Sequence, residues 1–173
     1  MSPAAAIGTD ITVRPASHAD AAAIAAIYNQ GIDDRLATFE TEHRAAVDVR
    51  AWFDAGYPVV VSESERALAA YAAAFPYRSR PCYAGVREFS VYVRRDFRGQ
   101  GHGKSVLSAL IGAVRAEGGW KLVSRIFPEN TASLALCRSL DFREVGVYRR
   151  HGMLDGRWRD TVIVEKLLDT EVG

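Results

Sequence analysis

The segment that most constrains the fold of this chain runs from an apolar strand through a glycine-rich turn into a helix. Residues 89–93 read Phe-Ser-Val-Tyr-Val, the alternation of a strand with two different faces. Residues 98–104 read Arg-Gly-Gln-Gly-His-Gly-Lys, and apolar residues then recur at helical spacing from Val106 to Val114. Strands that lead directly into helices are typical of sheets covered by helices, so the sequence predicts an α/β fold.

The glycine-rich turn also predicts an anion-binding site. Its three glycines let the backbone approach a phosphate closely, and the start of the helix offers free N–H groups and a positive dipole end. Four cations surround the turn: Arg94, Arg95, Arg98 and Lys104. A tight turn beside a solvated basic rim would use the same residues, but three alternating glycines among four cations favour a phosphate site.

Two common phosphate-binding patterns each fail at this turn by one position. A P-loop ends in Gly-Lys-Ser, as residues 103–105 do, but its first glycine would fall on Arg98. The dinucleotide pattern Gly-x-Gly-x-x-Gly meets Lys104 when it starts at Gly99 and Val106 when it starts at Gly101. The turn instead reads Arg-x-x-Gly-x-Gly from residue 98 to residue 103.

The rest of the chain alternates short strands and helices. Strands are expected at residues 11–15, 59–61, 67–75, 122–127, 145–151 and 157–167, and helices from 17, over 44–55, over 106–117 and from 130 to 140. Ser17 with Asp20 resembles a capping box, Asn130 suits an N-cap, and Asp155-Gly156 is a hairpin signal. The many alanines of residues 67–75 leave that strand open to a helical interpretation.

Length and composition favour one globular domain. The chain has 173 residues, and we expect a domain over residues 11–170 after a flexible arm at residues 1–10. Lys and Arg total 22 against 21 for Asp and Glu, so no basic surplus indicates binding to nucleic acid or a membrane. The two cysteines and four histidines show no metal spacing, and reduced thiols favour a cytoplasmic location.

Beyond the composition, the chain resembles a known enzyme superfamily. Arg98-x-x-Gly101-x-Gly103 after an apolar strand is similar to the coenzyme A pyrophosphate loop of the GNAT acetyltransferases. Further stretches resemble the phosphinothricin and arsinothricin acetyltransferase group, among them residues 27–32, 37–41, 88–93, 128–136 and 156–160. The resemblance spans residues 11–168 and implies the GNAT fold, with a mixed central sheet, flanking helices and an antiparallel hairpin at the C-terminal end.

The resemblance also implies acetyl-coenzyme A as co-substrate and a set of residues that hold it. The family's strand carries a bulge that splays it from its neighbour, so that its backbone holds the pantetheine arm. The corresponding residues here are Val91, Tyr92, Val93, Arg98, Gly99, Gln100, Gly101, His102, Gly103, Lys104, Asn130 and Ser133. No metal ligand is expected.

Two positions correspond to the family's catalytic groups. Glu88 matches the family's general base, which the resemblance implies takes the amine proton through a bound water; a solvated glutamate at a strand end is the alternative. Cys137 stands where relatives usually place Tyr or His as the acid that protonates the departing thiolate. A cysteine can donate a proton, but a small apolar residue packed on a helix explains it equally well.

The acceptor pocket is expected around a pair of arginines. Arg78 and Arg80 lie beside tyrosines just before Glu88, and two guanidiniums suit a small dianion. The resemblance implies a pocket formed by Phe39, Arg78, Arg80, Tyr83, Ser90 and Tyr92. It further implies N-acetylation of phosphinothricin or arsinothricin, which would detoxify an antibiotic or herbicide.

Several alternatives stay open at this point. Methionine sulfone or sulfoximine is the main rival acceptor, and a protein amino terminus is another. A non-catalytic acetyl-coenzyme A sensor would keep the fold without Glu88 acting as a base, and a nucleotide-hydrolysing switch would use Gly103-Lys104-Ser105. The family resemblance also implies a homodimer.

Overall fold

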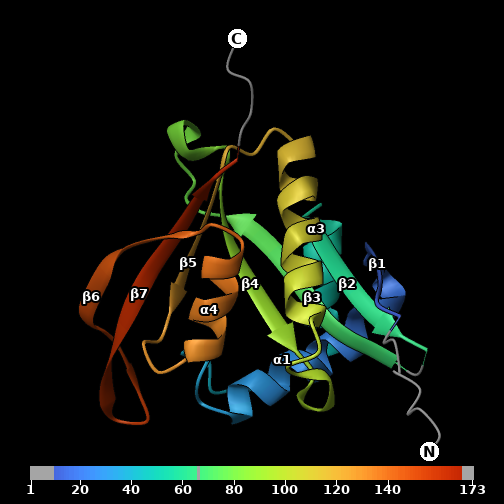
Figure 1. Cartoon of the computed structure of the whole chain (residues 1–173), viewed down its shortest axis with the longest axis horizontal. Helices are drawn as coiled ribbons and strands as arrows, with labels where there is room; N and C mark the ends of the chain where they lie inside the picture. Colours follow the sequence, from blue (N-terminus) through green and yellow to red (C-terminus); the bar gives the residue numbers. More distant parts are fainter. Residues whose placement is uncertain (1–9, 66, 169–173) are drawn as a thin grey trace, which may run out of the picture.

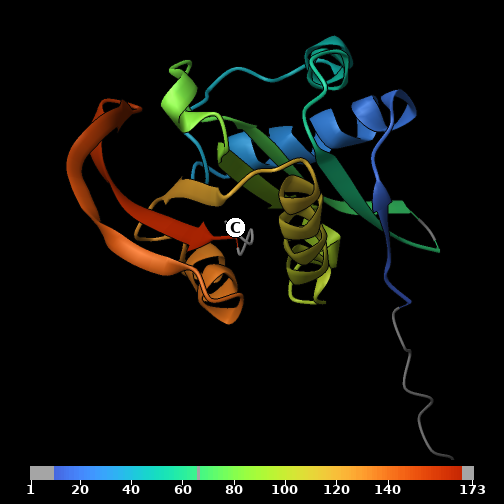
Figure 2. The same ribbon diagram turned by 90° about the horizontal axis from the view of Figure 1, so that it is seen from above.

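The computed structural model describes residues 10–65 and 67–168. It contains a seven-stranded sheet in the order β1-β2-β3-β4-β5-β7-β6, with helices on both faces (Figures 1 and 2). The strands are β1 (Thr12–Pro15), β2 (Val59–Ser64), β3 (Ala67–Pro76), β4 (Val86–Val93), β5 (Lys121–Ile126), β6 (Arg143–Leu154) and β7 (Arg157–Leu167). The helices are α1 (Ala21–Asp33), α2 (Ala46–Asp54), α3 (His102–Ala116) and α4 (Thr131–Ser139), with short 3-10 turns at His18–Asp20, Pro81–Tyr83 and Arg95–Phe97.

The predicted capping signals are confirmed. Asp20 closes a capping box with Ser17, where its carboxylate accepts the Ser17 N–H at 2.8 Å, and the chain continues from the 3-10 turn into α1. The Asn130 side chain accepts the Ser133 N–H at 3.2 Å and caps α4. Asp155 and Gly156 both have positive φ, as a two-residue hairpin turn between β6 and β7 requires.

Strand β3 settles the interpretation that its alanines left open. It is a central strand buried on both faces, with Ala70 and Ala72 in the core beneath α3 and Tyr71 and Ala73 in the core beneath α1 and α2. Small side chains let helices lie close to a sheet, which explains the alanines without a helix. The molecule therefore has two cores, one on each face, and Figure 2 shows α1 and α2 on one side of the sheet with α3 and α4 on the other.

The pairing of β4 with β5 differs from the other strand pairs of the sheet. This pair is parallel and covers only Val86 to Glu88 against Lys121 to Val123, whereas every other pair is antiparallel. Beyond Glu88 the two strands separate, which confirms the expected splay. The expected bulge in β4 is not seen in its pairing with β3, because that register steps regularly from Ala70–Val93 to Pro76–Arg87.

The expected flexible arm lies almost wholly outside the described residues, which begin at Asp10. Within the described ranges, no helix combines the length and the apolar character needed to cross a membrane.

Candidate active site

The gap between the diverging strands β4 and β5 is the centre of the site. After Glu88 the backbone of β4 no longer has β5 as a partner, and the Ser124 hydroxyl of β5 donates across the gap to the Phe89 carbonyl at 3.0 Å. Unpaired backbone groups of a strand can bind an extended ligand. The gap thus provides hydrogen-bonding backbone in the middle of the sheet.

A long groove of about 520 Å³, here called the loop groove, begins at the glycine-rich turn and runs to α4. Gly101 has φ +92°, a left-handed conformation that favours glycine, and it directly precedes α3. A side chain at Gly103 would approach Val93 and Leu136 to 3.3 and 3.4 Å, so this glycine also keeps the turn close to β4 and α4. The turn therefore presents backbone N–H groups and the start of α3 to the groove.

Most of the residues expected to hold the coenzyme line the loop groove. They are Val91, Tyr92, Val93, Arg98, Gly99, Gly101, His102, Gly103, Lys104, Asn130 and Ser133. Gln100 does not appear in this lining; its amide donates to the Asp96 carbonyl at 2.9 Å, inside the turn. Its role in binding stays a prediction.

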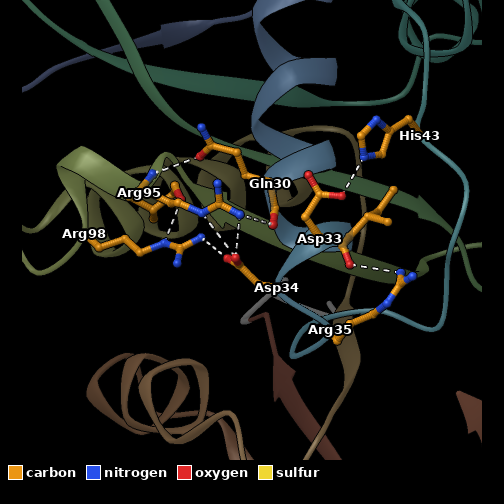
Figure 3. Close-up of polar contacts among 9 residues, drawn as sticks. Gln30, Asp33, Asp34, Arg35, His43, Arg95 and Arg98 are labelled. Atoms are coloured by element: carbon orange, nitrogen blue, oxygen red, sulfur yellow. Dashed lines mark hydrogen bonds and ion pairs between the residues drawn. The ribbon is translucent and has the colours of Figure 1, made fainter. Parts of the chain in front are cut away.

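Arg98 is held in place by an acid that the sequence did not single out. Asp34, at the end of α1, accepts from Arg95 at 2.6 Å and from Arg98 at 2.7 Å, and it lines the loop groove itself (Figure 3). Burial alone would raise the pKa of Asp34, but the hydrogen bonds from the two arginines outweigh it and hold the pKa below its usual range. Asp34 therefore stays ionised and orients the Arg98 side chain at the edge of the loop groove.

His102 contributes to the groove through its backbone, because its imidazole points into the core. The ring is 1% exposed, and its Nδ1 lies 2.9 Å from the Ser62 hydroxyl on β2. Burial lowers the pKa of His102, so the ring is neutral at physiological pH. This contact ties the first turn of α3 to the sheet.

Asn130, which caps α4, and Ser133 and Cys137 on that helix line a small cavity of about 60 Å³ in the strand gap. Cys137 is 2% exposed, and burial, with a contribution from Glu144, raises the pKa of its thiol to about 12. The thiol therefore carries its proton at neutral pH. Its role as an acid stays a prediction, and its burial also fits the alternative of a packed apolar residue.

A second large cavity, about 480 Å³, lies at the Glu88 end of the gap and is here called the Glu88 cavity. Three expected acceptor-site residues line it with Glu88: Phe39, Ser90 and Tyr92. Phe39 packs edge-on against Phe127 at 4.9 Å between ring centroids, and a side chain at Gly152 would collide with it. The wall expected from Phe39 is therefore fixed from both sides.

Of the two arginines that were expected to act as a pair, Arg78 lines a cavity that contains Glu88. This 200 Å³ cavity shares Glu88 with the Glu88 cavity, and the Arg78 guanidinium lies over the Tyr77 ring at 5.1 Å. Arg80 is exposed at the start of a 3-10 turn, and Tyr83 packs against Tyr77. Neither Arg80 nor Tyr83 is in the lining of these two cavities, so their contact with an acceptor stays a prediction.

The cation closest to Glu88 is Arg125, which the sequence interpretation did not single out. Its Nη2 lies 2.5 Å from Glu88 Oε1. His151 on β6 is exposed and also lines the Glu88 cavity. The sequence did contain a signal for Arg125. In a strand, the side chains of Leu122, Ser124 and Ile126 share one face, so the cation at position 125 must point to the other face.

Comparison with known proteins agrees with this geometry. Residues 24–142 match the family model described as the acetyltransferase (GNAT) family. The chain is 38% identical to phosphinothricin N-acetyltransferase of Alcaligenes faecalis, covering 91% of this chain and 83% of that protein. It is 36% identical to the L-methionine sulfoximine/L-methionine sulfone acetyltransferase of Pseudomonas paraeruginosa, covering 91% and 95% respectively.

A solved structure extends the agreement to three dimensions. An acetyltransferase of Salmonella typhimurium, solved with its cofactor acetyl-CoA, superposes with a TM-score of 0.88 at 34% identity, covering 94% of this chain and 96% of that one. The strand order, the splayed gap and the glycine-rich turn at the start of α3 thus occur in a chain that matches the family over most of its length. The chain belongs to the GNAT acetyltransferase family.

Proposed function

We propose that this enzyme transfers the acetyl group of acetyl-coenzyme A to the α-amino group of a small amino-acid-like compound. The observation that carries the proposal is that a small cavity shares lining residues with both the loop groove and the Glu88 cavity. The small cavity in the strand gap shares Val91, Asn130 and Ser133 with the loop groove, and it shares Ser90 and Arg125 with the Glu88 cavity. A coenzyme in the groove and an amine beside Glu88 would therefore meet in the gap.

The chemistry follows from the groups that line these cavities. An ammonium has no free electron pair, so Glu88 takes its proton, directly or through water. The amine nitrogen then forms a bond to the thioester carbonyl carbon and loses a further proton to solvent, the C–S bond breaks with its electron pair on sulfur, and the sulfur gains a proton to leave as a thiol. The protonated Cys137 beside Asn130 and Ser133 is the candidate donor of that proton.

Phosphinothricin and arsinothricin are the acceptors that we propose first, and methionine sulfone or sulfoximine is the second candidate. The first proposal is supported by the relative from Alcaligenes faecalis and by the cations Arg78 and Arg125, which line one cavity together with Glu88. The second is supported by the relative from Pseudomonas paraeruginosa, at nearly the same identity. The acceptors of the first class carry one negative charge on the side chain that those of the second class lack. Measuring turnover with a panel of both kinds of acceptor therefore separates the two proposals.

We further propose that the enzyme is a cytoplasmic homodimer. The edge of the sheet formed by β6 and β7 carries large apolar side chains that are about half exposed: Val145, Val147, Tyr148, Met153 and Trp158. Contiguous exposed apolar groups on an edge hairpin support burial against a second copy. Two unpaired cysteines, Cys82 and Cys137, support a reducing compartment. Sedimentation equilibrium measures the assembly state.

The first test of the proposed function removes the base. Glu88→Gln should lower kcat by roughly 10²-fold or more while leaving the affinity for acetyl-coenzyme A unchanged, because the amide keeps the shape and cannot take a proton. The measurement is thiol release on phosphinothricin and methionine sulfone, with calorimetric titration of the coenzyme. Normal turnover in this variant, or coenzyme binding by the parent without turnover of any amine, contradicts the proposal.

The matched test removes coenzyme binding. Gly101→Val places a branched side chain on a residue with φ +92° and should abolish measurable binding of acetyl-coenzyme A. Circular dichroism establishes that the variant folds. A folded variant with unchanged binding contradicts the assignment of the glycine-rich turn to the pyrophosphate.

A further inference from the structure

The contact between Arg125 and Glu88 places a cation directly on the candidate base. Arg125 Nε and Nη2 both donate to the same oxygen, Glu88 Oε1, at 3.1 and 2.5 Å. The Glu88 carboxylate, which is expected to take a proton, is therefore already paired with the Arg125 guanidinium.

Strand geometry fixes this contact. Val123 on β5 is the register partner of Glu88, and Arg125 follows two residues later on the same face of the strand. That residue stands where β4 and β5 diverge, so its long side chain spans the opening gap and reaches back to Glu88. Glu88 is 31% exposed and Arg125 48% exposed, so both charged ends remain accessible to a ligand.

Arg125 also dominates the charge of the acceptor site. It lines the Glu88 cavity, the small gap cavity and the 200 Å³ cavity that contains Arg78. In the lining of the Glu88 cavity, as far as the chain is described, it is the only Lys or Arg. The other acid of that lining, Glu40, is paired with Arg44 at 3.0 Å. An anionic group that enters the Glu88 cavity therefore meets Arg125.

The pair of Glu88 and Arg125 is complementary to an α-amino acid. An α-amino acid carries an ammonium and a carboxylate a few bonds apart, and the protein presents a carboxylate and a guanidinium in contact with each other. When such a molecule binds, the ion pair between Glu88 and Arg125 can be replaced by two ion pairs, one between Glu88 and the ammonium and one between Arg125 and the carboxylate. The planar fork of an arginine binds a carboxylate through two hydrogen bonds.

From this geometry we propose that Arg125 is a specificity-determining residue that selects acceptors with an α-carboxylate. The carboxylate of the acceptor takes the guanidinium of Arg125, and Glu88, released from that pair, faces the ammonium and takes its proton. An amine without a carboxylate offers no partner for Arg125, so Glu88 stays paired. The inference rests on the proposed function and adds the acceptor class to it, while Arg78 remains available for a side-chain anion.

The experiment compares two acceptors that differ in the carboxylate alone. They are methionine sulfone and its decarboxylated amine, 3-(methylsulfonyl)propylamine, measured by thiol release at saturating acetyl-coenzyme A. The parent enzyme should prefer the amino acid in kcat/KM. Arg125→Ala should lower kcat/KM for the amino acid roughly ten- to hundredfold, mainly through KM, and should leave the value for the amine unchanged or raise it. Arg125→Lys should recover part of the loss, because it keeps the charge without the fork.

A control variant removes an ion pair of the same geometry elsewhere. Arg143 donates to Glu165 Oε1 through Nε at 3.2 Å and Nη2 at 2.5 Å, and Arg143 is in the lining of none of the cavities described above. Arg143→Ala should leave both acceptors unaffected. This control separates the loss of an exposed ion pair from the loss of the acceptor contact.

A binding measurement keeps the inference independent of turnover. Calorimetric titration with 4-(methylsulfonyl)butanoate, which has the carboxylate and lacks the amine, should give a Kd at least roughly tenfold weaker in Arg125→Ala than in the parent. Equal losses for both acceptors, or an unchanged Kd, overturn the inference. Binding that depends on Arg125 without turnover of either acceptor supports the anion site and counts against the proposed function instead.

Discussion

Gly31 on helix α1 offers a quantitative test of how tightly the acceptor site is packed. A Cβ at this position would lie 2.4 and 2.6 Å from Cε1 and Cδ1 of Tyr92. The Tyr92 ring has little room to move, since it packs edge-on against Tyr28 at 4.9 Å and is stacked on the buried Tyr71 at 5.6 Å. Gly31→Ala must therefore displace a ring that lines the Glu88 cavity and the loop groove.

The expected magnitude comes from two opposing terms. Replacing a helical glycine by alanine stabilises a helix by up to about 1 kcal/mol. Overpacking a filled core costs about 1–3 kcal/mol, and contacts this short place the cost near the upper end. Gly31→Ala should then lower the free energy of unfolding by about 2 kcal/mol, which corresponds to a Tm lower by about 4–8 °C for a chain of this size.

A second helical glycine supplies the control. A Cβ at Gly112 in α3 would meet nothing within 4 Å, so Gly112→Ala should gain up to about 1 kcal/mol from helix propensity alone. Urea unfolding followed by circular dichroism measures both variants. If Gly31→Ala is as stable as the parent while Gly112→Ala is stabilised, the rigid packing of Tyr92 inferred here is wrong.

Two further predictions concern helix α4. Asp141→Gly should raise the free energy of unfolding by about 0.5–1 kcal/mol in the same urea assay. Asp141 follows the helix with φ +62°, and the Phe142 N–H donates to the Cys137 carbonyl, a C-terminal motif that favours glycine. A less stable variant contradicts this prediction. Cys137→Ser should lower kcat by less than about tenfold, since the thiol with a pKa near 12 is protonated and a hydroxyl can also donate. A loss as large as that of Glu88→Gln would instead make the thiol essential.

Short-range sequence signals predicted most of the fold. The capping residues Ser17 and Asn130, the turn at Asp155-Gly156 and the glycine-rich turn before α3 each act through backbone geometry within a few residues. Such effects do not depend on distant parts of the chain, and their positions were confirmed. The element ends shifted by up to a few residues, as for β6, which extends from Arg143 to Leu154.

The identity of strand β3 and the partners of charged side chains needed the tertiary structure. Alanines at 69, 70 and 72–74 fit a helix or a strand, and only burial between two helical layers decides for the strand. Asp34 and Arg98 are 64 residues apart along the chain and meet because α1 ends beside the glycine-rich turn. No short-range pattern encodes a contact of that kind.

The sequence by itself determined the α/β architecture, the glycine-rich turn as the candidate anion-binding element and Glu88 as the candidate base. These follow from residue spacing and from resemblance, and both are visible along one dimension. The tertiary structure alone decided which cation stands beside Glu88. Arg78 and Arg80 are near it in sequence, but Arg125 pairs with it, because the parallel register of β4 and β5 brings position 125 across the gap. Strand pairing, rather than proximity in the chain, sets the charge around Glu88.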